Sequence, residues 1–218
     1  MAKSGKMAGN SSIILIGGIF AVISMVVGIF CVLGAVVTYT GFPFRPLASP
    51  WPPFPIPVIN TGYSMWYQFI SELGVGPSAF MFNVGLILTG ILALPIFPGL
   101  LGLFRGSIIA KIGMVLGLTA SIALIGVGLA PMVMSPLHGP FAMVFFISVG
   151  IAIVLLSFEM YRGTFFSKAI AIYGVFFAAV DLAFLIRGGA VLEWAVFFVI
   201  VTWILVVGIQ VLLKRNEI

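Results

Sequence analysis

Charged side chains are scarce in this sequence: Asp, Glu, Lys and Arg together make up 7% of the 218 residues, against a hydrophobic share of 62%. A soluble globular domain carries about 25% charged residues. A compact fold of this chain would therefore have too few charges to cover its surface toward water. The composition excludes an ordinary soluble domain and indicates an integral membrane protein.

Cysteine and histidine are nearly absent, which limits the chemistry. Cys31 is the one cysteine, so an intramolecular disulfide is excluded, and its place in an apolar run is typical of a packing residue. His138 is the one histidine and has no partner ligands at metal-binding spacing, so we predict no metal and no cofactor. The motifs GxSxG and HExxH and a Gly-rich phosphate loop are also missing.

The basic balance of the chain, a net charge of +5, does not indicate nucleic acid. Nucleic-acid binding requires a basic stripe with interleaved aromatic side chains, whereas these charges flank apolar runs. The predicted spans given below place eight Lys and Arg residues on the side of the membrane that holds the two termini. Arg45 and Arg187 lie on the other side. Because cytoplasmic loops carry the excess of positive charge, we expect both termini in the cytoplasm and a multi-pass protein of the cell membrane.

Long apolar runs make up most of the sequence. They are continuous and apolar on all sides, which is typical of membrane helices and not of the alternating strands of a barrel. They predict an all-α membrane protein in which residues 1–218 form a single domain, a bundle of six transmembrane helices. The predicted spans are approximately residues 13–39, 79–104, 108–132, 140–161, 169–186 and 194–213. The first is too long for the apolar core of a secretion signal, so we expect it to be retained.

The connection between the first two spans, residues 40–78, is an outer loop with two different halves. Its first half, residues 42–57, is rich in proline and aromatic residues and favours an extended, polyproline-like backbone. Its second half, residues 62–73, predicts a short interfacial helix that ends at the following glycines and proline.

Proline and small residues predict local features of the spans. Pro95 and Pro98 are expected to kink the second span near its cytoplasmic end, and Pro131 is expected to end the third. Small residues that recur at every fourth position indicate a close helix contact along the third span: Gly113, Gly117 and Ser121.

Strongly polar residues in or beside the spans are candidates for function, because each is costly in lipid unless it is paired or hydrated. By the predicted topology, five of them fall toward the outer face. They predict an outward-facing pocket whose binding residues are Glu72, Asn83, His138, Asp181 and Arg187.

Each of these residues also has a structural interpretation. His138 lies in a Pro-Leu-His-Gly-Pro loop and is equally suited to start the fourth span at the interface. Asp181 is expected to pair with a neighbouring helix, with a tyrosine hydroxyl, or with Arg187 if that side chain curls back. Asn83 is typical of an interhelical hydrogen-bonding residue.

Two stretches of the sequence resemble a known family. The first joins Ser-Glu-Leu-Gly at residues 71–74 to Phe-Asn-Val-Gly-Leu-Ile-Leu-Thr-Gly at residues 82–90. The second joins Leu-Ile-Gly-Val-Gly-Leu-Ala-Pro at residues 124–131 to Pro-Leu-His at residues 136–138 and to Phe-Phe at residues 145–146. Together they resemble a prokaryotic family of six-span integral membrane proteins catalogued as a domain of unknown function, number 998.

The resemblance runs from the loop before the second span to the last span and leaves out the proline-rich half of the outer loop. Members of the family often carry Asp at the position of Glu72, which keeps the carboxylate. The family is also distantly similar to eukaryotic six-span proteins of GPI-anchor remodelling and autophagy modulation. What the resemblance implies is a fold and a topology.

The pocket predicts binding of a lipid headgroup or of a partner membrane subunit, so the expected partners are membrane lipids and other membrane subunits, with nucleic acid excluded. Two alternatives stay open. One is a membrane-embedded enzyme acting on a lipid-linked substrate, with His138, Glu72 and Asp181 as candidate catalytic residues and His138 with Glu72 as acid–base pair. A serine nucleophile would have to be Ser64, Ser71, Ser78 or Ser135. The other is a small proton-coupled transporter that uses Asp181.

Overall fold

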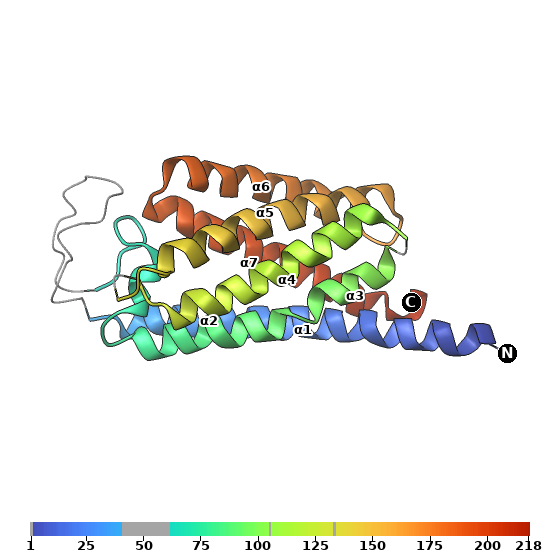
Figure 1. Cartoon of the computed structure of the whole chain (residues 1–218), viewed down its shortest axis with the longest axis horizontal. Coiled ribbons are helices and arrows are strands. Elements are labelled where there is room, and N and C mark those ends of the chain that lie inside the picture. The colour runs from blue at the N-terminus through green and yellow to red at the C-terminus, as the bar shows by residue number, and fades with distance from the viewer. Residues whose placement is uncertain (1, 41–61, 105, 133) are drawn as a thin grey trace.

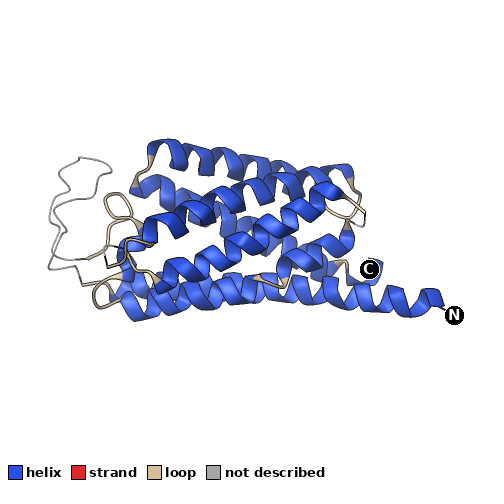
Figure 2. Ribbon diagram, in the orientation of Figure 1, coloured by secondary structure: helices blue, strands red, loops and turns tan. Residues whose placement is uncertain are grey.

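The computed structural model describes residues 2–40, 62–104, 106–132 and 134–218, with residues 2–10 described by their backbone alone. These residues form helices, turns and loops and no strand (Figure 2). In chain order the helices are α1 (Ala2–Thr38), η1 (Ile70–Gly74), α2 (Ala79–Ala93), α3 (Ile96–Leu103), α4 (Ile108–Leu129), α5 (His138–Arg162), α6 (Lys168–Arg187), α7 (Ala190–Leu213) and η2 (Arg215–Glu217).

The all-α prediction with six spans is confirmed, since 6 segments are long and apolar enough to cross a membrane. The second is made of α2 and α3 together, Ala79–Leu103. The first helix extends beyond the predicted span and begins at Ala2, and the last, α7, begins at Ala190. Gly188 and Gly189 both have positive φ angles, 65° and 101°, and reverse the chain so sharply that α7 starts directly after them. Glu193 therefore lies inside the last helix.

The predicted proline features are present. Pro95 separates α2 from α3, because it has no N–H to continue the helix. Pro98 lies in the first turn of α3, where that N–H is not needed. Pro131 follows the last residues of α4, as predicted. The break at Pro95 lets α3 lie across α1, where the backbones of Gly17 and Gly99 come into direct contact.

The interfacial helix predicted over residues 62–73 is wrong. Residues 62–69 form turns, and η1 is the first helical segment, a short 3₁₀ helix. Side-chain oxygens accept from backbone amides that would bond to backbone carbonyl oxygens in a longer helix. Gln68 Oε1 accepts from Ser64 N at 2.8 Å, and Glu72 Oε1 accepts from Phe69 N at 3.1 Å. The proline-rich half of the outer loop lies outside the described residues.

Six helices form a ring in the order α1, α2, α4, α5, α6 and α7, in which each packs against the two beside it (Figure 1). The small-residue stripe of α4 packs closely as predicted: Gly113 faces the side chain of Leu156 on α5, and Gly117 faces the ring of Phe97 on α3. Large apolar side chains such as Phe30, Ile122 and Ile186 are exposed on the outside of the ring, where lipid would cover them.

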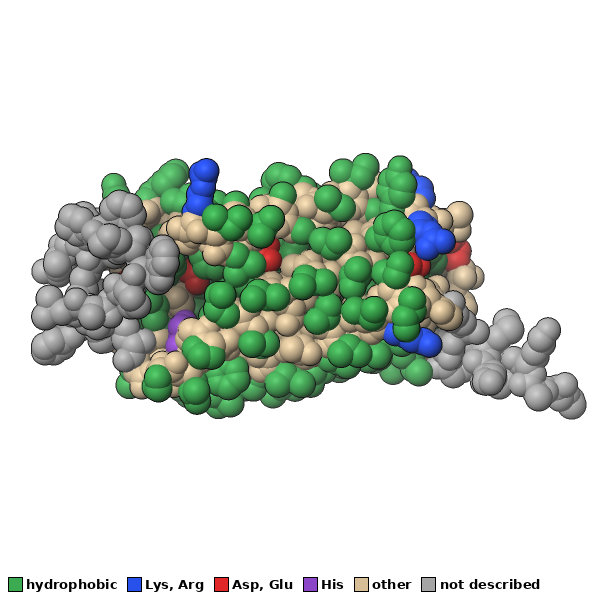
Figure 3. Space-filling model, turned by 45° about the horizontal axis from the view of Figure 1, so that its top comes forward, with side chains coloured by type: hydrophobic (Ala, Val, Ile, Leu, Met, Phe, Trp, Pro, Cys, Tyr) green, Lys and Arg blue, Asp and Glu red, His purple; other side chains and the backbone are tan. Residues whose placement is uncertain are grey.

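Both termini lie at one end of the bundle, and η1 lies at the other end (Figure 1). Blue side chains, those of Lys and Arg, gather near the end with the termini in Figure 3, and the middle of the bundle is green with apolar side chains. Which face of the membrane each end occupies stays a prediction from the charge bias. Below, the end that carries η1 is called the outer end.

Candidate functional site

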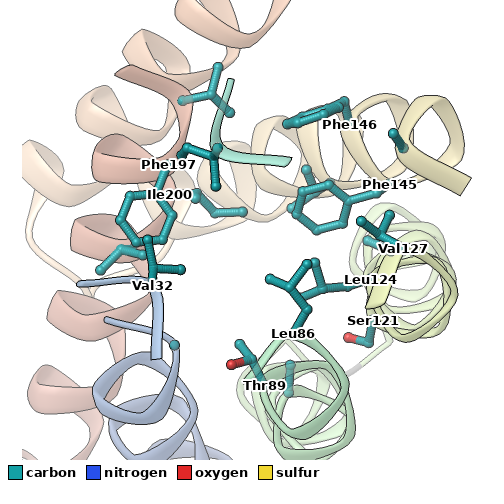
Figure 4. A pocket seen from close by; sticks show the side chains of 18 of the residues that line it. Val32, Leu86, Thr89, Ser121, Leu124, Val127, Phe145, Phe146, Phe197 and Ile200 are labelled. Carbon is teal, nitrogen blue, oxygen red and sulfur yellow. The ribbon is translucent and has the colours of Figure 1, made fainter. Parts of the chain in front are cut away.

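A cavity of about 130 Å³ lies inside the helix ring. Its wall is almost entirely apolar and comes from α1, α2, α4, α5 and α7, with η1 at the outer end and Phe97 of α3 at the other. Figure 4 shows side chains from these helices pointing toward a shared space, among them Val32, Leu86, Leu124, Phe145 and Ile200. The cavity therefore offers a lipophilic interior at the centre of the bundle.

The polar residues that line the cavity lie at two levels. At the outer end they are Ser71, His138 and Glu193. Farther along the bundle they are Thr89 on α2 and Ser121 on α4 (Figure 4). Ser121 donates to its own helix at Gly117 O (3.0 Å), whereas the buried hydroxyl of Thr89 has no partner among the described residues. The outer end thus carries the ionisable groups.

Glu193 links η1 to α7 through a hydrogen bond. Its Oε2 accepts a hydrogen bond of 2.6 Å from the backbone N of Ile70, and its side chain is buried, with 8% exposed. Glu72 takes the preceding amide, Phe69 N. Two carboxylates therefore satisfy the first amides of one short helix, where the partial positive charge of the helix favours them.

Aromatic residues hold the chain just before η1. The hydroxyl of Tyr63 accepts from Trp194 Nε1 at 3.0 Å and lies 2.7 Å from the carbonyl oxygen of Phe69, to which it donates. The Tyr63 ring contacts Tyr39 and Trp194 edge-on, with centroids 5.4 and 5.7 Å away. Burial, and to a lesser degree the nearby carboxylates, raises the pKa of Tyr63 above its ordinary value. Its hydroxyl therefore stays protonated and remains a donor.

His138 begins α5 and faces the cavity with a fixed ring. Its Nδ1 lies 2.8 Å from the carbonyl oxygen of Ala130. A carbonyl oxygen can only accept, so Nδ1 carries the proton of the neutral ring and Nε2 is left as an acceptor. His138 thus joins the residue after α4 to the start of α5 and contributes to the cavity wall.

Glu72 and Asn83 support the outer end from beside the cavity. Asn83 Nδ2 donates to the carbonyl oxygen of Gly74 at 2.9 Å and so ties the end of η1 to α2. Glu72 binds within η1 as described above. Neither residue belongs to the cavity wall. Their predicted role in ligand binding stays a prediction, and what the structure shows is that they position η1.

Asp181 and Arg187 lie apart from the cavity. Asp181 is buried between α6 and α5, where its carboxyl group lies over Gly150, and its Oδ1 has no hydrogen-bond partner among the described residues. Arg187 is exposed at the end of α6. The expected pairing of Asp181 with Arg187 or a tyrosine is wrong, because the described parts of the chain supply no polar partner to Oδ1. The five predicted residues do not line one cavity.

Glu193 and Ser71 line the cavity and were missing from the predicted set. An acidic residue in the first turn of a helix is also explained by the helix dipole, so the position of Glu193 in the sequence gives no signal of a cavity. Its hydrogen bond to Ile70 joins residues 123 positions apart, and no local pattern contains that distance. Within the described residues, no three His, Cys, Asp or Glu side chains lie close enough to hold a metal ion.

Comparison with known proteins gives one family and no individual relatives. No curated protein and no solved structure matches this chain. The distant likeness to GPI-remodelling and autophagy proteins therefore stays a prediction.

A family model matches residues 53–210. The match contains every cavity-lining residue except those of α1, and it confirms the resemblance carried by the two motif stretches. It begins at Pro53, inside the proline-rich half of the outer loop, so the expectation that this half lies wholly outside the resemblance is wrong. Because the match covers more than half of the sequence, the chain belongs to the membrane family described as "Protein of unknown function (DUF998)".

Proposed function

We propose that this protein binds a membrane lipid, with one lipid chain in the central cavity and the polar head at the outer end. The observation that carries the proposal is the division of the cavity wall: apolar side chains along its length, and Ser71, His138 and Glu193 together at one end. A concave, largely apolar site with a few polar groups at one place is typical of sites for small amphiphilic molecules.

The dimensions of the cavity favour a slender occupant. Both Glu193 and Ile204 of α7 line it, and at 1.5 Å per residue they lie about 16 Å apart along the helix. A volume of about 130 Å³ is close to that of an apolar cavity known to hold a single benzene ring, roughly 150 Å³. The space therefore admits a segment of one acyl or prenyl chain and excludes a two-chain phospholipid as a whole.

Native lipid analysis of two matched tryptophan variants tests the proposal. Leu124 points into the cavity (Figure 4). Ile122, on the same helix, is 60% exposed and does not belong to the cavity wall. We expect Leu124→Trp to carry roughly tenfold less of a co-purifying single-chain lipid, because overfilling a packed space costs about 1–3 kcal/mol. Ile122→Trp should keep the wild-type amount.

Mass spectrometry of lipids extracted from purified protein gives the amounts, and a thermal melt of each variant shows whether it remains folded. Equal lipid content in folded wild type and folded Leu124→Trp would contradict the proposal. A protein that carries no small molecule and co-purifies with a second membrane protein would favour the partner-subunit alternative.

Catalysis on a lipid-linked substrate is the second candidate, because Ser71 and His138 line the same end of the cavity. Of the four serines considered above, Ser71 is the one in the cavity wall, but its hydroxyl donates to Met132 Sδ at 3.2 Å. Conversion of added lipid that is lost in His138→Asn and in Ser71→Ala would support this candidate. Asp181 lies outside the cavity wall, so the cavity adds no support to a transporter that uses it.

A further inference from the structure

The outer end of the cavity presents hydrogen-bond acceptors. Glu193 contributes a carboxyl group, whose Oε2 already accepts from Ile70 N and whose oxygens are hydrogen-bond acceptors. His138 contributes Nε2, because its Nδ1 proton is held by Ala130 O. A polar head that enters this end therefore meets acceptors from α7 on one side and from α5 on the other.

The described residues of the cavity wall carry no positive charge at a Lys or Arg side chain. The nearest cation along the chain to Glu193 is Arg187, which is exposed on α6, a helix that contributes nothing to the described wall. An anionic head, such as a phosphate or a carboxylate, would meet the carboxyl oxygens of Glu193 and could not donate to them, and no described cation in the wall would offset its charge.

The polar head of the lipid must also supply most of the selectivity between one lipid and another. A lipid chain that leaves the bilayer for an apolar cavity exchanges one apolar surrounding for another, so the hydrophobic effect gains little and packing alone acts on the chain. A hydrogen bond to a charged group is stronger and is lost entirely when the head has the wrong polarity. Selectivity should therefore follow the donor character of the head.

We propose that the cavity selects single-chain lipids whose head is a hydrogen-bond donor, an alcohol or an amine, with Glu193 and His138 as the accepting residues. This inference rests on the proposed lipid-binding function. It assigns to Glu193 a specificity-determining role at the same site where that residue holds Ile70 N.

Three amphiphiles that share one chain and differ in the head test this selectivity: dodecanol, dodecylamine and dodecanoic acid. The full-length protein in nanodiscs is equilibrated with equal amounts of the three, recovered, and its bound amphiphiles are measured by mass spectrometry. We expect dodecanol and dodecylamine to exceed dodecanoate about tenfold after correction for the amounts in the lipid disc, the scale of one hydrogen bond to a charged group.

Glu193→Gln identifies the residue responsible. The glutamine carbonyl can still accept from Ile70 N, so η1 stays attached, while the side chain gains an amide donor and loses its charge. The preference for dodecylamine over dodecanoate should fall to near one. Glu159→Gln, which removes the largely buried carboxylate at the other end of the bundle, should leave the preference unchanged. If Glu193→Gln does not fold, His138→Phe keeps a ring at the outer end and removes the Nε2 acceptor, and it should weaken the same preference.

The outcomes separate the two proposals. If the wild-type protein binds dodecanoate as well as or better than the other two, donor selectivity is overturned and lipid binding stands. An unchanged preference in folded Glu193→Gln and in folded His138→Phe overturns the roles of these residues. Absence of all three amphiphiles above the disc background overturns lipid binding itself.

Discussion

Asp181 shapes its surroundings although its Oδ1 has no hydrogen-bond partner in the described part of the chain. It is 2% exposed, and a Cβ atom added to Gly150 on α5 would lie 2.3 Å from Asp181 Oδ2. The carboxyl group is thus accommodated because position 150 has no side chain. A buried polar group with no hydrogen bond reduces stability, so selection for folding alone does not account for Asp181.

Gly150→Ala is expected to destabilise the protein by about 1–3 kcal/mol through this overlap. In an Asp181→Ala background the same change should cost much less, since the overlapping oxygen is gone, and the pair should be strongly non-additive in a double-mutant cycle. Thermal denaturation in detergent measures all four forms. Gly139→Ala, on the same helix with open space around its Cβ position, is the control and should be close to neutral. An equal cost of Gly150→Ala with and without Asp181 would contradict the contact.

The candidate site could be predicted from the sequence in part. His138 was identified because a lone imidazole beside an apolar span is unusual, and it does line the cavity. Asp181 and Arg187 were grouped with it by depth in the membrane alone. Depth is set by position along each helix, whereas the direction in which a side chain points is set by helix rotation and by the neighbouring helices. Asp181 faces α5 at the correct depth and lies outside the cavity.

At the scale of the helix, α3 depends on close backbone contact. A Cβ atom on Gly99 would lie 2.7 Å from the Cα atom of Gly17, which is backbone and cannot rotate away. A Cβ atom on Gly102, one turn along the same helix, would meet the side chain of Ile14 at 2.7 Å, and that side chain can change rotamer. The two glycines therefore differ in what an added methyl group would displace.

We expect Gly99→Ala to lower stability by about 1–3 kcal/mol and Gly102→Ala to lower it by clearly less. The two variants are matched controls for each other, since both add one methyl group to α3. Thermal melts of the purified proteins rank them. The reverse order would show that α3 does not cross α1 at these two backbones.

For the whole molecule, the charge bias makes a prediction that labelling can test. In a Cys31→Ser background, Trp66→Cys lies near the outer end at a site that is 73% exposed, and Asn216→Cys lies beside the C-terminus. A membrane-impermeant maleimide applied to intact cells should label Trp66→Cys and should label Asn216→Cys only after the membrane is permeabilised. The opposite pattern would place both termini outside the cytoplasm.

The membrane class, the six spans and the break at Pro95 all follow from the order of residues along the chain. These features are local: a span is a run of apolar residues, and a proline acts on its own helix. Family membership also follows from the order of residues along the chain. The interfacial helix was mispredicted because Gln68 and Glu72 bond to nearby amides, a choice that local propensity does not decide.

The cavity and its polar end depend on contacts between residues that are far apart in the sequence. Ile70 and Glu193 meet through a hydrogen bond between distant parts of the chain, and helices from both halves of the sequence contribute to the cavity wall. In lipid, an apolar side chain is equally well placed toward the bilayer or toward another helix, so hydropathy does not distinguish the two sides of a span. Packing at residues such as Gly99 and Gly117 selects the side that faces inward, and with it the residues that surround the cavity.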